Sequence, residues 1–350
     1  MRIAQIAPLT EAVPPRLYGG TERVVSYLTE ALVRQGHDVT LFASGDSVTT
    51  AQLHACWPSA LRFDAGLSDP HAPHVLMLEA VFEQAGEFDL LHFHMDYSPF
   101  PLFSRHRTPF VNTLHGRLDL PEFVPIFERF RHVPVVSISD AQRRPLPTAN
   151  FVRTIYHGLP PDLLTPYPIK PAYLAFLGRI SPEKQPERAI RIARRAGVPL
   201  RIAAKVDRVD EAYYRERIRP LIDGRHVELI GEIGDADKAE FLSGAIALLM
   251  PIDWPEPFGL VMIEAMACGT PVIAFDRGSV SEVVDHGLTG FIVQDEPSAV
   301  AAVPLAADLS RPLVRRRFLE RFTADRMAGQ YLELYAALGR ERRPTLRLAI

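Results

Sequence analysis

Short apolar runs alternate with helical segments along this chain, and that alternation limits its fold more than any other feature. Residues 3–7 form the first run, and a glycine loop then leads to Thr21, from which apolar residues recur at helical spacing. Gly36 follows the helix as its terminating glycine, and residues 39–43 form the next apolar run. A strand–helix–strand unit of this kind predicts a parallel sheet with a right-handed crossover.

The alternation stops at a proline-dense stretch and restarts near Tyr173, and 350 residues are too many for one ordinary core. We therefore expect an α/β domain over 1–160, a linker over 161–171, an α/β domain over 172–323, and a helix with a tail over 324–350. In such sheets ligands bind beyond the carboxyl ends of the strands, so two facing sheets would bind a ligand in a central cleft. Further strands are expected at 90–93, 110–113, 135–138, 174–177, 201–206, 227–230, 247–251, 272–275 and 291–293.

Composition narrows the classes of function. The net charge of −3 argues against general nucleic-acid binding. The two cysteines, Cys56 and Cys268, form neither a metal-binding spacing nor a disulfide framework. The first apolar run is too short for a signal peptide, and no apolar stretch reaches the 18 residues of a membrane span. We therefore expect a cytoplasmic protein.

Residues 255–271, PEPFGLVMIEAMACGTP, carry the strongest chemical signal. Glu256 lies in a loop after an apolar strand, and Glu264 lies inside a nearly all-apolar helix that should be buried. A buried carboxylate needs a partner, and a ribose diol offers two donors to one carboxylate. The alternatives to ligand binding are that Glu264 forms a structural ion pair and that Glu256 is an exposed acid of a loop.

The start of that helix is a second candidate binding element. The backbone amides of Phe258, Gly259 and Leu260 have no partner within the helix and suit a sugar hydroxyl or a phosphate.

These features resemble the retaining glycosyltransferases of family 4, which have the GT-B fold: two Rossmann-like domains with parallel sheets facing a central cleft. The resemblance rests first on two glutamates separated by seven residues, with Pro-Phe-Gly between them and Ala-Cys-Gly-Thr-Pro-Val after them. It extends over most of the chain in family order. The other family-like stretches are GGTE at 19–22, TLHG at 113–116, GRISPEK at 178–184, GSVSEV at 278–283 and GLTG at 287–290.

The resemblance implies an enzyme that moves a hexosyl group from a UDP- or GDP-sugar to a hydroxyl acceptor and forms an α-glycosidic bond. It implies front-face attack, with the leaving phosphate taking the acceptor proton, and a C-terminal helix that packs back across the domain junction. We expect neither a metal ion nor a cofactor besides the nucleotide sugar. The expected catalytic residues are His115, Arg179, Lys184 and Glu256, and the expected donor-binding residues are Gly19, Gly20, Lys205, Phe258, Gly259, Leu260 and Glu264.

The charges of the chain favour the same basic residues as diphosphate ligands, without reference to the family resemblance. The chain has 35 arginines and only four lysines, so a lysine is not its default cation. Arg179 ends a predicted strand and Lys184 lies in the turn before a helix, where two cations would neutralise a diphosphate leaving group. Lys205, at the end of another predicted strand, is a third candidate. The alternative is that Arg179 and Lys184 belong to a solvated turn without a ligand.

In the N-terminal half, Gly19 and Gly20 precede a helix N-terminus, which is a ready anion site. The loop lacks the full G-x-G-x-x-G dinucleotide fingerprint. His115 follows an apolar strand, where a neutral imidazole would donate a hydrogen bond to the donor sugar, and a structural histidine is the alternative.

Two sequence motifs could bind a metal ion, but we expect neither of them to do so. His92 and His94 share one face of a strand, but a third ligand at convincing spacing is missing. Asp235-Ala236-Asp237 spells the metal-binding triplet of the other glycosyltransferase fold, yet it precedes a helix, so we expect helix capping.

Rival functions remain. A sugar-nucleotide epimerase or an NAD-dependent oxidoreductase would use a similar scaffold, and a GT-B-like binding protein could have lost turnover. The presence of Arg179, Lys184 and the two glutamates, Glu256 and Glu264, disfavours the binding protein.

The acceptor is the least constrained partner. Residues 1–160 contain 13 arginines and no lysine against 16 acidic residues, so this domain gains little from an anionic membrane. A basic patch would need the fold to gather three arginine pairs. We expect a small-molecule or saccharide acceptor, with peripheral membrane contact not favoured, and a solvated tail from Arg340 to Arg347. The three pairs are Arg105 and Arg107, Arg129 and Arg131, and Arg143 and Arg144.

Overall fold

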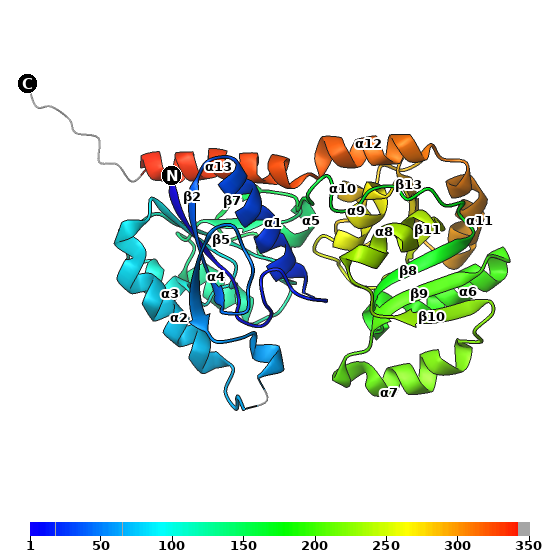
Figure 1. Ribbon diagram of the computed structural model, residues 1–350, viewed down its shortest axis with the longest axis horizontal. Helices are drawn as coiled ribbons and strands as arrows, with labels where there is room; N and C mark the ends of the chain where they lie inside the picture. The colour runs from blue at the N-terminus through cyan, green and yellow to red at the C-terminus, as the bar shows by residue number, and fades with distance from the viewer. Residues whose placement is uncertain (18, 65, 342–350) are drawn as a thin grey trace, which may run out of the picture. The chain divides into compact units, whose positions relative to one another are not determined.

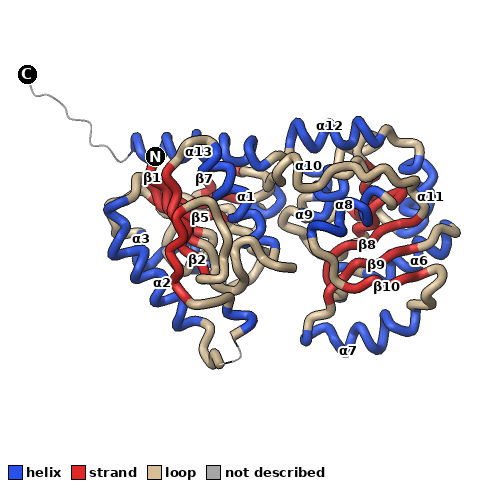
Figure 2. Tube along the Cα trace, in the orientation of Figure 1, coloured by secondary structure: helices blue, strands red, loops and turns tan. Residues whose placement is uncertain are grey.

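The computed structural model describes residues 1–17, 19–64 and 66–341 (Figure 1), so most of the predicted arginine-rich tail lies outside the described residues. The chain divides into two compact units. The first contains Met1–Gly158 and the helix that begins at Ala324, and the second contains Leu159–Thr323. Helices flank a central sheet in each unit (Figure 2).

The first unit has a seven-stranded sheet of order β3-β2-β1-β4-β5-β6-β7, and every neighbouring pair is parallel. The strand order reverses between β1 and β4, which is the switch point where open α/β sheets bind ligands. The strands are β1 (Arg2–Ile6), β2 (Asp38–Ser44), β3 (Gln52–Trp57), β4 (Leu90–Phe93), β5 (Phe110–Thr113), β6 (Val135–Ser137) and β7 (Phe151–Thr154). The helices are α1 (Gly20–Arg34), α2 (His71–Gln84), α3 (Phe100–Phe103), α4 (Phe123–Arg129), α5 (Asp140–Arg143) and α13 (Ala324–Glu341).

Helix α1 follows the predicted pattern. Its apolar side chains Val24, Val25, Leu28 and Leu32 are buried, and Gly36 terminates it with a φ of 82° that favours glycine. Helix α13 also packs on this unit, where Tyr331 and Tyr335 are almost completely buried. The last described helix of the chain therefore belongs to the core of the first unit.

The second unit has a six-stranded parallel sheet of order β10-β9-β8-β11-β12-β13, with its switch point between β8 and β11. One buried cluster joins β8, β9 and β11 to helices α6 and α11. The strands are β8 (Tyr173–Arg179), β9 (Leu200–Lys205), β10 (Val227–Gly231), β11 (Ala245–Met250), β12 (Val272–Phe275) and β13 (Gly290–Val293). The helices are α6 (Pro186–Ala196), α7 (Glu211–Tyr213), α8 (Asp235–Ser243), α9 (Leu260–Ala267), α10 (Val280–Val283), α11 (Glu296–Ala307) and α12 (Arg311–Arg321).

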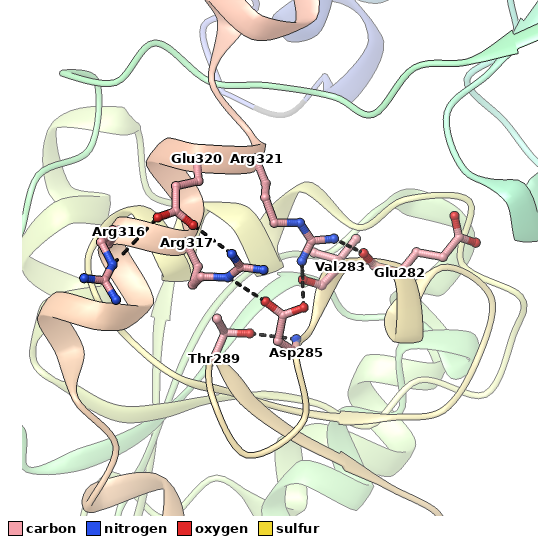
Figure 3. A network of polar contacts seen from close by, with 8 residues as sticks. All are labelled: Glu282, Val283, Asp285, Thr289, Arg316, Arg317, Glu320 and Arg321. Carbon is pink, nitrogen blue, oxygen red and sulfur yellow. Dashed lines mark hydrogen bonds and ion pairs between the residues drawn. The ribbon is translucent and has the colours of Figure 1, made fainter.

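An ion-pair network attaches α12 to the loop between α10 and β13 (Figure 3). Both oxygens of Asp285 are bonded, one to Arg317 and one to Arg321, at 2.9 Å each. Arg321 also donates to the Glu282 carbonyl at 2.6 Å, and the Thr289 hydroxyl accepts from the Asp285 amide. Because this loop follows β12 and precedes β13, the network fixes the edge of the second sheet.

The two parallel α/β sheets predicted from the sequence are confirmed, whereas β3 and β7 were missed. Of the arginine pairs, Arg105 and Arg107 precede β5, and Arg129 and Arg131 precede β6. Both pairs therefore lie at the amino edge of the sheet. Arg143 instead contacts β7, with its guanidinium 4.9 Å from the Phe151 ring. No helix in the described part of the chain is long and apolar enough to cross a membrane.

Candidate functional site

The candidate residues of the second unit lie where its strands end. Arg179 is the last residue of β8, Lys205 is the last residue of β9, and Glu256 lies in the loop that follows β11. The backbone amide of Asp253 in that loop donates to the Glu183 carbonyl at 2.9 Å. The turn after β8 and the loop after β11 are therefore joined at the carboxyl edge of the sheet, on either side of its switch point.

Lys184 and Glu256 form an ion pair within this junction. The Lys184 ammonium contacts Glu256 Oε2, and Trp254 Nε1 donates to the same oxygen at 2.9 Å. The ammonium also lies 4.9 Å from the centre of the Trp254 ring. The Glu256 residue is only 8% exposed. Lys184 therefore does not lie in a solvated turn, and Glu256 is not an exposed loop acid.

The loop after β12 clamps the Glu256 segment through its backbone. Gly278 has a φ of 58°, and a Cβ at this position would lie 2.2 Å from the Glu256 carbonyl oxygen. The Ser279 amide donates to that carbonyl at 3.0 Å, and the Ser279 hydroxyl donates to the Phe258 carbonyl at 2.8 Å. Only glycine allows so close an approach here, which gives a physical reason for glycine in the GSVSEV stretch.

Glu264 is buried in α9 and has a lysine partner. Lys238 Nζ donates to Glu264 Oε1 at 2.7 Å, and the two residues are 8% and 3% exposed. Asp235 lies 3.2 Å from the same ammonium. The side-chain N-cap predicted for the Asp235 triplet is not formed, because Gly234 is the N-cap of α8, but Asp235 and Asp237 lie in the first turn, where acidic groups suit the helix dipole. Sequence reasoning missed Lys238, although its rarity as a lysine was a signal.

Arg179 is surrounded by carboxylates. Its guanidinium is hydrogen-bonded to Glu183 and lies 3.7 Å from both Asp207 and Asp210. Burial raises the pKa of Asp210, and the neighbouring Glu183 and Asp207 carboxylates act in the same direction. Lys205 pairs with Asp207 at 2.9 Å. An incoming polyanion would have to replace carboxylates around these cations.

The start of α9 has the expected geometry of a helix N-terminus. Gly259 is the N-cap residue with a φ of 79°, its carbonyl accepts from the Met262 amide at 3.0 Å, and Leu260 is the first helical residue. Phe258 is 2% exposed. A Cβ on Gly259 would lie 2.9 Å from the methyl carbons of Met250 and Met262, which are flexible side-chain ends, so it is the positive φ that favours glycine here.

In the first unit, His115 directly follows β5, is half-buried, and contacts two buried histidines. Its Nε2 lies 2.8 Å from His94 Nδ1, and its ring stacks on His157 with centroids 5.2 Å apart. Burial lowers the pKa of His115 to about 3, so its imidazole is neutral near pH 7. The described residues provide no hydrogen-bond partner for His115 Nδ1. They also contain no group of three side chains that could bind a metal.

The glycine loop lies at the start of α1. Gly19 is the N-cap residue, and Gly20 is the first helical residue. A Cβ on Gly19 would lie 2.8 Å from the Pro15 Cβ. Glu22 in the first turn is buried, and this burial, with a contribution from Glu11, raises its pKa to about 7. This loop therefore places a weakly acidic carboxyl beside the glycines.

Two family models match the chain. The model for glycosyl transferases group 1 matches residues 166–311, and the model for glycosyltransferase family 4 matches residues 18–139. Each match falls within one of the two sheet-containing units.

Individual relatives match nearly the whole chain. The chain is 28% identical to phosphatidyl-myo-inositol mannosyltransferase of Mycobacterium leprae, over 91% of this chain and 90% of the relative. Among solved structures, sucrose-phosphate synthase of Thermosynechococcus elongatus has a TM-score of 0.80 at 21% identity, covering 97% of this chain and 99% of that one. Anabaena HepE in complex with UDP and glucose has a TM-score of 0.72 at 19% identity, covering 96% and 99%.

Proposed function

Because the chain belongs to glycosyltransferase family 4 and is a glycosyltransferase with the GT-B fold, we propose that it moves a hexosyl group from a UDP- or GDP-sugar to a hydroxyl acceptor. The transfer retains the configuration of the donor and forms an α-glycosidic bond.

The observation that carries the proposal is the joined set of charged residues at the carboxyl edge of the second sheet. Arg179 at the end of β8 and Lys184 in the turn that follows present two cations, and Glu256 lies beside Lys184 in the loop after β11. Departure of a nucleoside diphosphate builds negative charge on its phosphates, and fixed cations there stabilise the transition state. Glu256 and the amides of Phe258, Gly259 and Leu260 then bind the sugar.

Glu264 binds the nucleotide ribose in this proposal. The Lys238 bond involves Oε1, so the same carboxylate can accept from a ribose hydroxyl through its remaining lone pairs. Burial of the pair keeps bulk water from competing for those lone pairs. Lys205, at the end of β9, adds a third cation near the donor phosphates.

The proposal also assigns roles to residues of the first unit. His115 contacts the donor sugar, and the loop at Gly19 and Gly20 provides helix amides for donor oxygens. The acceptor hydroxyl attacks from the front face, and its proton passes to the departing phosphate oxygen. The bond between the sugar C1 and that oxygen breaks as the new C1–O bond forms, so neither a metal ion nor a protein nucleophile is required.

Two relatives support the choice of donors without deciding between them. The Anabaena structure contains UDP and glucose, and the mycobacterial relative is a mannosyltransferase. For the acceptor, we favour a small molecule or a saccharide over a membrane lipid, because the first domain carries a net charge of −3. We place the enzyme in the cytoplasm.

Nucleotide release from a panel of UDP- and GDP-sugars, measured with and without hydroxyl acceptors, tests the proposal. We expect one donor to release its nucleoside diphosphate faster when an acceptor is present. Conversion of a nucleotide sugar to its epimer, or reduction of NAD, without any transfer would instead support the rival activities.

A further inference from the structure

A buried hydrogen-bond chain extends from His115 through the core of the first unit. His94 Nε2 lies 2.8 Å from Gln5 Oε1, and the Gln5 amide nitrogen donates to the Tyr335 hydroxyl at 3.2 Å. Tyr335 in turn lies 2.6 Å from His92 Nδ1. Gln5, His92, His94 and Tyr335 are each at most 3% exposed. Four side chains, from β1, β4, the residue after β4 and α13, thus form a polar chain without access to bulk water.

The donor and acceptor capacities of the groups give this chain a direction. The Gln5 amide nitrogen can only donate, so the Tyr335 hydroxyl accepts from it at 3.2 Å, and the remaining contact of that hydroxyl in the described residues is His92 Nδ1 at 2.6 Å. The Tyr335 hydroxyl therefore donates to His92 and accepts from Gln5. This arrangement turns the Gln5 carbonyl oxygen toward His94, and a carbonyl oxygen can only accept.

The direction of the chain determines the proton positions on two histidines. His94 must carry its proton on Nε2 in order to donate to Gln5. Burial lowers the pKa of His94 well below its ordinary value, so the ring is neutral and its Nδ1 is an acceptor. The contact between His94 Nδ1 and His115 Nε2 then requires the proton to lie on His115 Nε2. His115 Nδ1 is left as a lone-pair nitrogen, and the described residues give it no partner.

We propose that Gln5 and His94 are positioning residues that fix the tautomer of His115, so that His115 Nδ1 accepts a hydrogen bond from a hydroxyl group of the bound sugar. This inference rests on the proposed glycosyl transfer. It reverses the direction expected from the sequence, in which His115 donates to the sugar. The hydroxyl must be free to donate, which restricts the donor to sugars that keep it unsubstituted.

The tautomer is measurable in the free protein. In protein carrying ¹⁵N-labelled histidine, long-range ¹H–¹⁵N spectra distinguish protonated from lone-pair ring nitrogens, and His115→Gln identifies the His115 signals by their loss. We expect wild-type His115 to carry its proton on Nε2. A proton on Nδ1 in the wild type would overturn the proposal, and this result does not depend on any enzymatic activity.

Variants test whether Gln5 sets this state. Gln5→Leu removes the acceptor for His94, and we expect the His115 tautomer to change and kcat/KM to fall about 10-fold, the factor for ~1.4 kcal/mol, which is close to one hydrogen bond. Tyr331→Phe is the matched control. It removes an equally buried hydroxyl that contacts Thr113 at 2.9 Å, outside the route from Gln5 to His115. An unchanged His115 tautomer in Gln5→Leu, or an equal tautomer change in the control, would contradict the proposal.

Modified donors test the direction of the final hydrogen bond. Replacing the contacting hydroxyl by fluorine leaves a weak acceptor but no donor. We therefore expect the fluorinated donor to be as poor a substrate as the corresponding deoxy donor with wild-type enzyme. The comparison is made at each hydroxyl position of the sugar in turn. If the fluorinated donor is clearly a better substrate than the deoxy donor at every position, His115 donates the hydrogen bond and the proposal is contradicted. Absence of transfer from any nucleotide sugar would refute the proposed function, while the tautomer measurement would still decide the roles of Gln5 and His94.

Discussion

Replacing Lys238 with methionine should destabilise the second unit strongly. The substitution keeps the apolar stem but removes the ammonium that contacts Glu264 Oε1 at 2.7 Å, and Glu264 is only 3% exposed. An uncompensated buried charge costs about 3–5 kcal/mol of folding free energy. For a unit of this size each kcal/mol lowers Tm by about 2–4 °C, which gives a decrease of about 6–20 °C.

Differential scanning calorimetry of four proteins would measure the effect: wild type, Lys238→Met, Glu264→Gln and the double variant. The double variant should recover most of the loss, because a neutral amide in a neutral site leaves no unpaired charge. Arg215→Met is the control, since it breaks an exposed pair with Glu211 and should change stability by less than about 1 kcal/mol. The account is wrong if Lys238→Met melts within about 1 °C of wild type, or if the double variant is no more stable than Lys238→Met.

The remaining predictions concern the proposed reaction. Glu264→Gln should weaken calorimetric binding of the free nucleoside diphosphate, while Glu256→Gln should mainly slow transfer, and equal affinity of Glu264→Gln and wild type would remove the ribose role. Arg179→Ala and Lys184→Ala should each cost about 2–4 kcal/mol of transition-state stabilisation, and wild-type turnover in both would refute their role at the diphosphate. Activity should persist in EDTA, and its complete, reversible loss there would show that a metal ion is needed. The anomeric proton of the product should show the NMR coupling of an α-linkage, and a β-type coupling would overturn retention from an α-linked donor.

The sequence could predict the sheets because both follow from local patterns. Continuous apolar runs marked the buried central strands, and glycine at position 36 marked the end of α1. The missed strands β3 and β7 lie at the two edges of the first sheet and are only partly buried, as their mixed sequences QLHACW and FVRT indicate. Edge strands lack the continuous apolar signal of buried parallel strands.

The candidate site was predictable in its residue types but not in its partners. Glu256, Lys184 and Arg179 were recognisable as charged groups beside strand ends. That Lys184 pairs with Glu256 could not be predicted, because the two residues are 72 positions apart and meet only when two strands become neighbours. The bond from Gln5 to Tyr335 spans 330 positions and depends on the return of α13 to the first unit. Periodicity and spacing contain no information about such contacts.

The central claim is acceptor-dependent glycosyl transfer from a nucleotide sugar, and one reaction measured for both products tests it most directly. Mass spectrometry of a single mixture would quantify the nucleoside diphosphate and the acceptor that has gained one hexosyl unit. We expect the two products to form in equal amounts with wild-type enzyme, and both rates to fall about 30- to 1,000-fold in Lys184→Ala. A glycosylated acceptor formed without equimolar nucleoside diphosphate, or at the wild-type rate in Lys184→Ala, would contradict the account.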